Sequence, residues 1–243
     1  MIPKIIHYCW FGGNPLPESA KKCIASWRKF LPDYEIKEWN ESNFDVNIIK
    51  FTKEAYRLKK YAFVSDYARM WILYNYGGLY FDTDVELIKP IYDIIERGNF
   101  MGREPQIDDN DHWTDSENFG ANPGLGLGVA PGLGLYKEIL DWYSKQHYIS
   151  KLGKILAPTI VNVVSDIIGN KPFKRYEDGI IFTSGVYIYP SEYFCPKNYA
   201  TGKLTITPNT RSIHHFASTW VKSDETLFQK IQRRLNGLKA YYL

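Results

Sequence analysis

The sequence predicts an α/β fold in which helices flank a central sheet, and three observations support it. The chain has 243 residues, enough for one substantial hydrophobic core. Its composition, 44% apolar and 23% charged, is that of an ordinary globular domain. Short extended segments alternate with segments of helical periodicity, which is the order typical of α/β proteins. We therefore expect residues 1–243 to form a single domain.

The first half of the chain predicts strands that alternate with helices, located by apolar patterns of period two and period 3.6. The expected elements are strands at 2–10, 34–39 and 99–103 and helices at 17–31, 48–61 and 90–97. Ligands collect at the carboxyl ends of strands in open α/β sheets, which makes the loop after residue 10 a candidate site. Trp10 stands at this position and is a candidate residue of that site. Its alternative role is packing in the core.

The stretch that organises the sequence is residues 62–86, a buried helix followed by two glycines and an extended segment. Apolar residues lie on nearly every side of the helix. Ser65, Asp66 and Arg69 interrupt them, at spacings of three and four that place these polar residues on one face. Buried charge is costly unless it is paired or used, so this face is a candidate site. Gly77 and Gly78 then supply a left-handed exit from the helix.

After the two glycines the polarity alternates with period two, which predicts a strand over residues 79–86. The alternation places Asp82 and Asp84 on one side, with Cα atoms about 6.6 Å apart from the strand rise. Two carboxylates at this separation can converge on one hard cation, one of them through water or a ligand oxygen. The alternative is a solvated strand edge, but the buried polar helix that precedes it favours a functional site.

The second half of the chain is less regular. Residues 104–122 are acidic and lack periodicity, and a loop of this length is usually functional or mobile. The glycine-rich segment that follows lacks the Gly-Lys-Ser/Thr ending of a phosphate loop, so we expect a strand, a Pro-Gly turn and a helix through Trp142. The remaining expected elements are a helix at 158–168, strands at 180–189 and 204–207, an extended segment at 212–220 and a helix at 223–243.

Two adjacent histidines make the segment 212–220 a candidate part of the site. If the segment stays extended, alternation places His214, Phe216, Ser218 and Trp220 on one side, which favours His214 over His215. The helix at 223–243 combines an apolar stripe with a basic face. It either packs on the domain with a solvated basic side or makes a peripheral contact with anionic lipid.

Charge, cysteine content and hydropathy exclude several classes of protein. A net charge of +3 is too weak to indicate nucleic acid as a partner. The three cysteines are far apart and form neither a disulfide framework nor a zinc-binding pattern. The N-terminus lacks the basic lead and apolar core of a signal peptide, and no apolar run approaches the ~20 residues of a membrane span. We expect a cytoplasmic protein.

The segment SDYARMWILYNYGGLYFDTDVELIKP, residues 65–90, resembles the sugar-nucleotide region of glycosyltransferase family 32. The resemblance extends to IPKIIHYCWFGG at the start and to SGVYIYPSEYFCPK and SIHHFASTW near the end, and it is loose between residues 102 and 182. This family includes yeast Golgi mannosyltransferases, bacterial capsular polysaccharide transferases and, distantly, the glucosylating core of clostridial toxins. The resemblance implies a GT-A-type, Rossmann-like domain with a mostly parallel mixed sheet.

The resemblance also implies a role for each candidate residue. Asp82 and Asp84 would be the catalytic residues, with Asp84 as the direct ligand of Mn²⁺ or Mg²⁺ and Asp82 acting through metal-bound water or the ribose. His214 would complete the metal site, since an imidazole ligand favours Mn²⁺. The residues implied to bind the nucleotide-sugar donor are Trp10, which would stack on the base, and Ser65, Asp66, Arg69, Asp82, Ser218 and Trp220.

The implied activity is transfer of a hexose from a nucleotide sugar, with a UDP-sugar favoured, to a glycan or lipid-linked acceptor in surface-polysaccharide synthesis, including capsule. Members of the family generally retain the anomeric configuration. Residues 1–103 would bind the donor, and residues 104–222 would supply the acceptor side and a closing segment. Residues 223–243 would form a C-terminal amphipathic helix, for which peripheral contact with the inner membrane face is one of the two roles given above.

Two other functions compete with this interpretation. One is a non-catalytic protein that binds nucleotide sugars or carbohydrate through the same metal site. The other is a haloacid-dehalogenase-like phosphatase, because residues 81–85 superficially resemble its nucleophile motif. That motif normally lies on the first strand, whereas here about eighty residues precede it.

Overall fold

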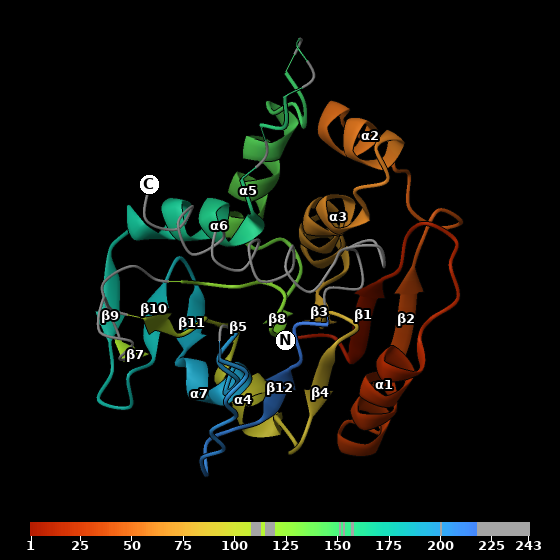
Figure 1. The fold of residues 1–243 in the computed structure, drawn as a ribbon. Coiled ribbons are helices and arrows are strands. Elements are labelled where there is room, and N and C mark those ends of the chain that lie inside the picture. The colour runs from red at the N-terminus through yellow and green to blue at the C-terminus, as the bar shows by residue number, and fades with distance from the viewer. Residues whose placement is uncertain are drawn as a thin grey trace.

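The fold is built around one eight-stranded sheet (Figure 1). The computed structural model describes residues 1–107, 113–114, 120–150, 152, 154–156, 158–199 and 201–217. In spatial order the strands are β2 (Glu35–Trp39), β1 (Ile5–Cys9), β3 (Gly78–Tyr80), β8 (Leu127–Val129), β5 (Phe100–Gly102), β11 (Val186–Tyr189), β10 (Ile181–Thr183) and β9 (Phe173–Arg175). Only β8 and β10 run against the others, so six of the eight strands share one direction.

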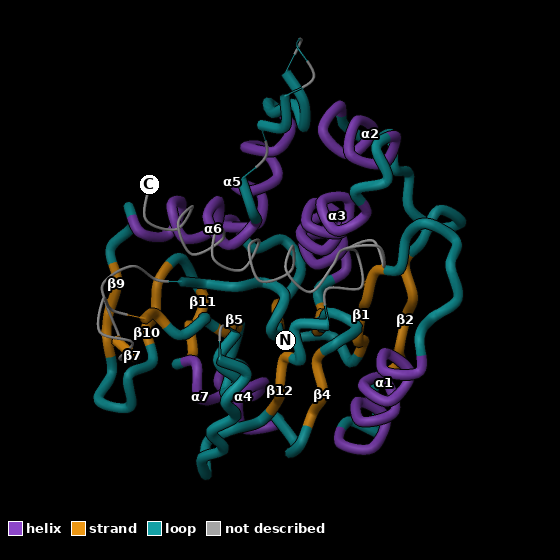
Figure 2. The backbone as a smooth tube through the Cα atoms, in the orientation of Figure 1, coloured by secondary structure: helices purple, strands orange, loops and turns teal. Residues whose placement is uncertain are grey.

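Helices cover both faces of this sheet (Figure 2). One face carries α2 (Lys50–Arg57), α3 (Tyr61–Tyr76), α5 (Gly134–Ser144) and α6 (Ile160–Gly169). The other carries α1 (Glu18–Phe30), α4 (Tyr92–Arg97) and α7 (Ser191–Phe194). Each layer has its own hydrophobic core. Successive strand residues separate between the two cores: Leu79 and Phe81 enter one, while Tyr80 enters the other. The predicted α/β architecture with a mostly parallel mixed sheet is confirmed.

Small sheets complete the described fold. β4 (Val85–Leu87) pairs antiparallel with β12 (Ser212–His214), and β6 (Gln106–Ile107) pairs with β7 (Trp113–Thr114). In the described part of the chain, no helix has both the length and the apolar character needed to cross a bilayer.

Two predicted strands are wrong in the second half of the chain. The expected strand at 180–189 is a hairpin of β10 and β11, because Ser184 and Gly185 adopt left-handed φ values of 52° and 80° between them. The expected strand at 204–207 is absent, and Leu204 makes only an isolated bridge to Lys197. Apolar alternation in these short segments did not reveal where the chain turns.

The predicted glycine exit from the central helix is confirmed. Gly77 and Gly78 have φ values of 64° and 99°, a region that residues with a Cβ resist. A Cβ on Gly78 would also lie 2.7 Å from the carbonyl oxygen of Ile5. The glycine pair therefore lets the chain leave α3 and enter the sheet directly beside β1.

The imidazole of His7 ties this turn to the sheet. Its Nδ1 accepts a hydrogen bond from the indole of Trp39 at 3.0 Å, and its Nε2 lies 3.0 Å from the carbonyl oxygen of Gly77. Because Nδ1 accepts, Nε2 carries the proton and donates to Gly77. Burial lowers the pKa of His7 to about 4, so the ring is neutral in the native protein at pH 7.

This buried neutral histidine predicts a specific loss of stability in acid. Between the unfolded pKa near 6.5 and the native value of about 4, the unfolded chain binds a proton that the native protein does not. We expect the free energy of unfolding to fall by about 2–3 kcal/mol more in the wild type than in His7→Gln between about pH 7.5 and about pH 4.5. Urea titrations at the two pH values measure the difference, and identical pH dependence would contradict it.

Candidate active site

The polar residues of α3 are held by one buried guanidinium. Arg69 is 4% exposed, and its Nη2 donates to Asp66 Oδ1 at 3.0 Å. Its Nε donates to the carbonyl oxygen of Ser65 at 3.3 Å, whereas the Ser65 hydroxyl turns back onto the carbonyl oxygen of Tyr61. Asp66 and Arg69 therefore form a hydrogen-bonded pair inside the helical layer, beside the sheet.

The same guanidinium reaches the Asp-x-Asp segment. Nη1 and Nη2 of Arg69 lie 3.3 and 3.2 Å from the two carboxylate oxygens of Asp82. The Tyr80 hydroxyl donates to Asp82 as well, and the Tyr80 ring lies under the guanidinium at 4.9 Å. One cation thus orients two carboxylates that are 16 residues apart in the sequence.

The predicted strand over residues 79–86 is wrong at its centre. β3 ends at Tyr80, and the backbone N–H of Val85 donates to the carbonyl oxygen of Asp82 at 3.0 Å, which closes a turn. The chain then leaves the main sheet and enters β4. The turn, rather than strand alternation, sets the directions of the Asp82 and Asp84 side chains.

Pairing of β12 with β4 brings the late histidines to this turn. His214 lies opposite Val85, and its Nε2 is 3.2 Å from Asp84 Oδ1. The backbone N–H of Ala217 donates to Asp84 Oδ2 at 2.8 Å. His215 points away and meets Glu86 instead, at 2.8 Å. His214 rather than His215 therefore faces Asp84, as the alternation predicts.

The continued alternation beyond His214 is wrong. Phe216 has a left-handed φ of 54°, so the extended conformation ends within two residues of β12. Ser218, Trp220 and the helix expected at 223–243 lie outside the described residues, and their predicted roles stay predictions.

The carboxylates of this site differ in charge state. Burial alone would raise the pKa of Asp84, but His214 and the hydrogen bond from Ala217 lower it to about 2. Burial raises the pKa of Asp66 to about 7 against the opposing charge of Arg69, and burial likewise raises the pKa of Asp82. The pKa of His214 is raised, because Asp84 outweighs the cost of burying the imidazolium. Of these three carboxylates, Asp84 therefore has the lowest pKa and remains ionised to the lowest pH.

Asp82, Asp84 and His214 fit a divalent cation. Each offers one ligand atom, and the three atoms lie within 4.8 Å of one another. An ion that binds oxygen at about 2.1 Å holds opposite ligands about 4.2 Å apart, so small side-chain rotations would close this set around it. Two carboxylates and an imidazole suit Mn²⁺, and the carboxylates also suit Mg²⁺.

Gly124 is part of this site, although its sequence context gave it no role. Its carbonyl oxygen accepts from the backbone N–H of Asp82 at 3.3 Å, and its own N–H donates to Asn122 Oδ1 at 2.7 Å. A Cβ at this position would lie 2.3 Å from Asp82 Oδ2. The Asn-Pro-Gly sequence at 122–124 signals a turn, but only the fold shows that this turn lies against Asp82.

Trp10 is partly buried and directly follows β1. Its indole N–H donates to the carbonyl oxygen of Asn14 at 2.6 Å, and its ring packs beside the core on the α1 side of the sheet. The predicted stacking of this ring on a nucleobase stays a prediction.

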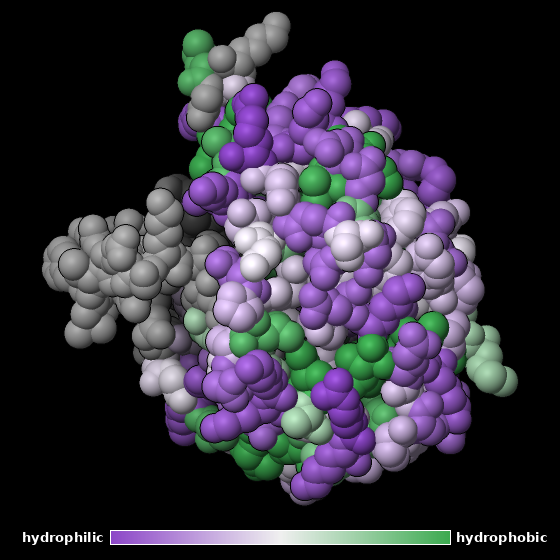
Figure 3. Space-filling model, turned by 90° about the vertical axis from the view of Figure 1, so that its right-hand side faces the viewer, coloured by the Kyte–Doolittle hydropathy of each residue, from purple (hydrophilic) through white to green (hydrophobic). Residues whose placement is uncertain are grey.

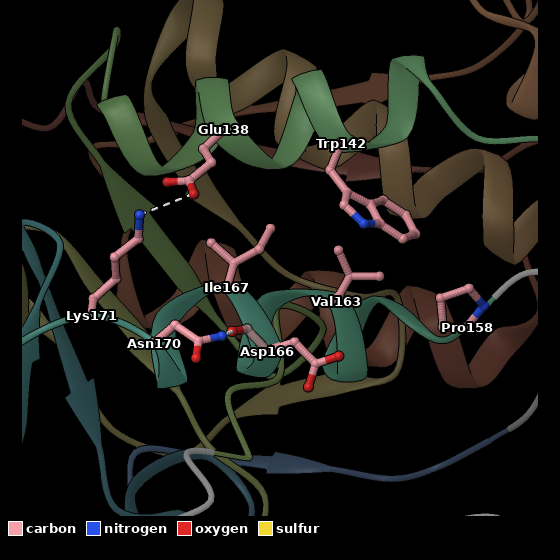
Figure 4. Close-up of a pocket in the computed structure, with 8 residues that line it drawn as sticks. All are labelled: Glu138, Trp142, Pro158, Val163, Asp166, Ile167, Asn170 and Lys171. Atoms are coloured by element: carbon pink, nitrogen blue, oxygen red, sulfur yellow. Dashed lines mark hydrogen bonds and ion pairs between the residues drawn. The ribbon is translucent and has the colours of Figure 1, made fainter.

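A separate hollow of about 310 Å³ lies between α5 and α6 (Figure 4). Lys171 and Glu138 pair across one end of it at 3.0 Å, and Trp142 forms part of the wall. Among the described residues, none of those predicted to bind donor or metal lines this hollow.

Comparison with known proteins bears on the same region. Residues 17–101, which include α3 and both aspartates, match the family described as glycosyltransferase sugar-binding region containing DXD motif. This region of the chain is therefore similar to a glycosyltransferase sugar-binding region. The resemblance predicted from residues 65–90 is thereby confirmed.

Two curated relatives come from Schizosaccharomyces pombe (strain 972 / ATCC 24843). Inositol phosphoceramide mannosyltransferase 1 is 29% identical over 111 residues, which are 41% of this chain and 33% of that protein. Inositol phosphoceramide mannosyltransferase 3 is 32% identical over 92 residues, 35% of this chain and 24% of that protein. The match thus spans a third or less of the length of these relatives.

Two solved structures are also similar. The galactosyltransferase LgtC, in complex with donor and acceptor sugar analogues, has a TM-score of 0.47 at 15% identity and covers 96% of this chain and 95% of its own. The PaToxG glycosyltransferase has a TM-score of 0.45 at 16% identity and covers 68% of each chain.

The close approach of Gly124 to Asp82 can be tested by substitution. Gly124→Ala forces a Cβ against the Asp82 carboxylate, and we expect it to lower the free energy of unfolding by about 1–3 kcal/mol. Gly134→Ala is the matched control, because a Cβ there meets nothing within 4 Å at the start of α5. We expect that control to be neutral or to stabilise by up to about 1 kcal/mol. Chemical denaturation measures both, and equal effects would remove Gly124 from the site.

Proposed function

We propose that the protein is a metal-dependent, retaining glycosyltransferase. It moves a hexose from a nucleotide sugar, with a UDP-sugar favoured, to a glycan or lipid-linked acceptor in surface-polysaccharide synthesis at the cytoplasmic side of a membrane. The observation that carries the proposal is the convergence of Asp82, Asp84 and His214 beside Arg69. Asp82, Asp84 and Arg69 all lie within the region that matches the sugar-binding family.

The chemistry explains why this arrangement is needed. A departing nucleoside diphosphate gains negative charge as the glycosidic bond breaks, and a bound Mn²⁺ or Mg²⁺ would supply the positive charge that stabilises it. Asp84, ionised well below neutral pH, and His214 would hold the ion directly. Asp82 is the most accessible of these carboxylates, with 29% of its side chain exposed. It would contact the donor or a metal-bound water.

Arg69 is best placed as a positioning residue for Asp82. Only 5% of its side chain is exposed, and its guanidinium is already shared between Asp66 and Asp82. It would fix the angle at which Asp82 meets the donor. Asp66 and Ser65, with Ser218 and Trp220, would complete the donor site, and Trp10 would stack on the base.

The relatives suggest the transferred group. Two are named as mannosyltransferases and one solved neighbour as a galactosyltransferase, all of which transfer hexoses. A haloacid-dehalogenase-like phosphatase would need Asp82 as a free nucleophile, whereas both of its oxygens lie within 3.3 Å of Arg69. A non-catalytic sugar-binding protein would bind the donor without turning it over. Release of nucleoside diphosphate therefore distinguishes it from the transferase.

Metal dependence is the first test of the proposal. We expect Asp84→Asn to reduce turnover of nucleotide sugars in the presence of Mn²⁺ by at least about 100-fold, because a fixed charge of the metal site is lost. Asp141→Asn is the matched control, since that aspartate is exposed and, among the described residues, forms its ion pair with Lys137. Release of nucleoside diphosphate measures turnover across a panel of donors. Full activity in EDTA or in Asp84→Asn would refute metal-assisted transfer.

A further inference from the structure

The connection between α5 and α6 carries an unusual group of exposed apolar side chains. Leu152 is 97% exposed, and Ile155 and Leu156 are 51% and 52% exposed. In Figure 1 this connection projects beyond the end of α5, beside α2. Figure 3 shows apolar atoms at the projecting end of the molecule next to strongly hydrophilic ones. Isolated exposed apolar residues are ordinary, but three within five residues at a projecting tip indicate a contact surface.

Hydrogen bonds join the two arms of this connection. The backbone N–H of Ser150 donates to the carbonyl oxygen of Lys154 at 2.8 Å, and the N–H of Lys154 donates to Ser150 Oγ at 3.0 Å. Ile149 and Ile155 form a bridge, and the N–H of Leu156 donates to the carbonyl oxygen of Tyr148 at 3.0 Å. The apolar side chains are therefore presented by a closed turn.

The base of the turn is fixed to α2. The Tyr148 ring is fully buried and packs edge-on against Phe51 and Phe63, with centroids 5.6 and 4.9 Å away. Glu54 of α2 accepts from the backbone N–H of Tyr148 at 2.9 Å and pairs with His147 Nδ1 at 2.8 Å. The tip and α2 therefore behave as one surface.

That surface is basic. Glu54 is already engaged by the turn, and Lys50 and Arg57 lie one helical turn to either side of it, on the same side of α2. Lys145, at the end of α5, and Lys154, within the turn, are exposed as well. We call the set Leu152, Ile155 and Leu156 with Lys50, Arg57, Lys145 and Lys154 the basic tip.

We propose that the basic tip binds the surface of an anionic lipid bilayer. Its three apolar side chains would enter the headgroup–acyl boundary, and its cations would meet anionic headgroups. A narrow, projecting group of this kind suits a lipid surface better than a protein, because a stable protein interface buries about 800 Å² on each partner. The inference goes beyond the proposed function, and it concerns residues distinct from the helix predicted at 223–243.

Vesicle co-sedimentation of the full chain tests the proposal. We expect binding to vesicles of phosphatidylcholine mixed with phosphatidylglycerol, weakened by salt, and little binding to phosphatidylcholine alone. Leu152→Ser/Ile155→Ser should reduce binding at least tenfold, as should Lys50→Gln/Arg57→Gln. The matched control is Leu204→Ser/Ile206→Ser, which alters two side chains that are 46% and 49% exposed on another part of the surface. It should bind like the wild type.

Several results would overturn the proposal. They are undiminished binding by the Leu152→Ser/Ile155→Ser variant, an equal loss in the control, absence of binding to any vesicle, or equal binding to neutral vesicles. A concentration-dependent dimer that disappears in the same variant, measured by light scattering, would instead assign the tip to a second copy of the chain. Nucleotide-sugar turnover without vesicles should be unchanged in all these variants, so failure here is distinguishable from failure of the proposed transferase.

Discussion

The structure depends most on the burial of one cation, the guanidinium of Arg69, between the carboxylates of Asp66 and Asp82. A buried charge is tolerated only when its partners are close and well oriented. This requirement fixes the rotation of α3 about its axis and its distance from the turn after β3. It also accounts for Gly124, because the backbone of residues 122–124 lies where a side chain would displace Asp82. The contacts that form the site are therefore also the contacts that pack this region.

The second half of the site depends on a strand pair outside the main sheet. β4 is held on one side by α1, where the Trp27 indole donates to the Val85 carbonyl oxygen at 2.7 Å. The Ser26 hydroxyl also accepts from the backbone N–H of Leu87 at 2.9 Å. On its other side β4 pairs with β12, which delivers His214. Asp84 and His214 are about 130 positions apart in the sequence. Backbone hydrogen bonds between their segments bring them together, and these bonds do not require a ligand.

α3 links the two surfaces to which we assign functions. Phe63, in its first turn, packs against Tyr148 at the base of the basic tip, and Arg69 follows six residues later beside Asp82. A rigid helix between the two surfaces would fix the height of the donor site above a bound bilayer. Such an arrangement would suit the proposed transfer to an acceptor held in a membrane.

The sequence by itself determined the α/β class, the buried polar helix, its glycine exit and the pair of aspartates. The first three follow from the local residue pattern, and the pair of aspartates was visible as a motif, although the directions of its side chains were not. The sequence also selected His214 over His215 by alternation. It did not reveal the turn between Asp82 and Asp84, the hairpin at Ser184 and Gly185 or the role of Gly124. The tertiary structure decided these features, because hydrogen bonds and contacts between distant segments set where a chain turns and which backbone a carboxylate touches.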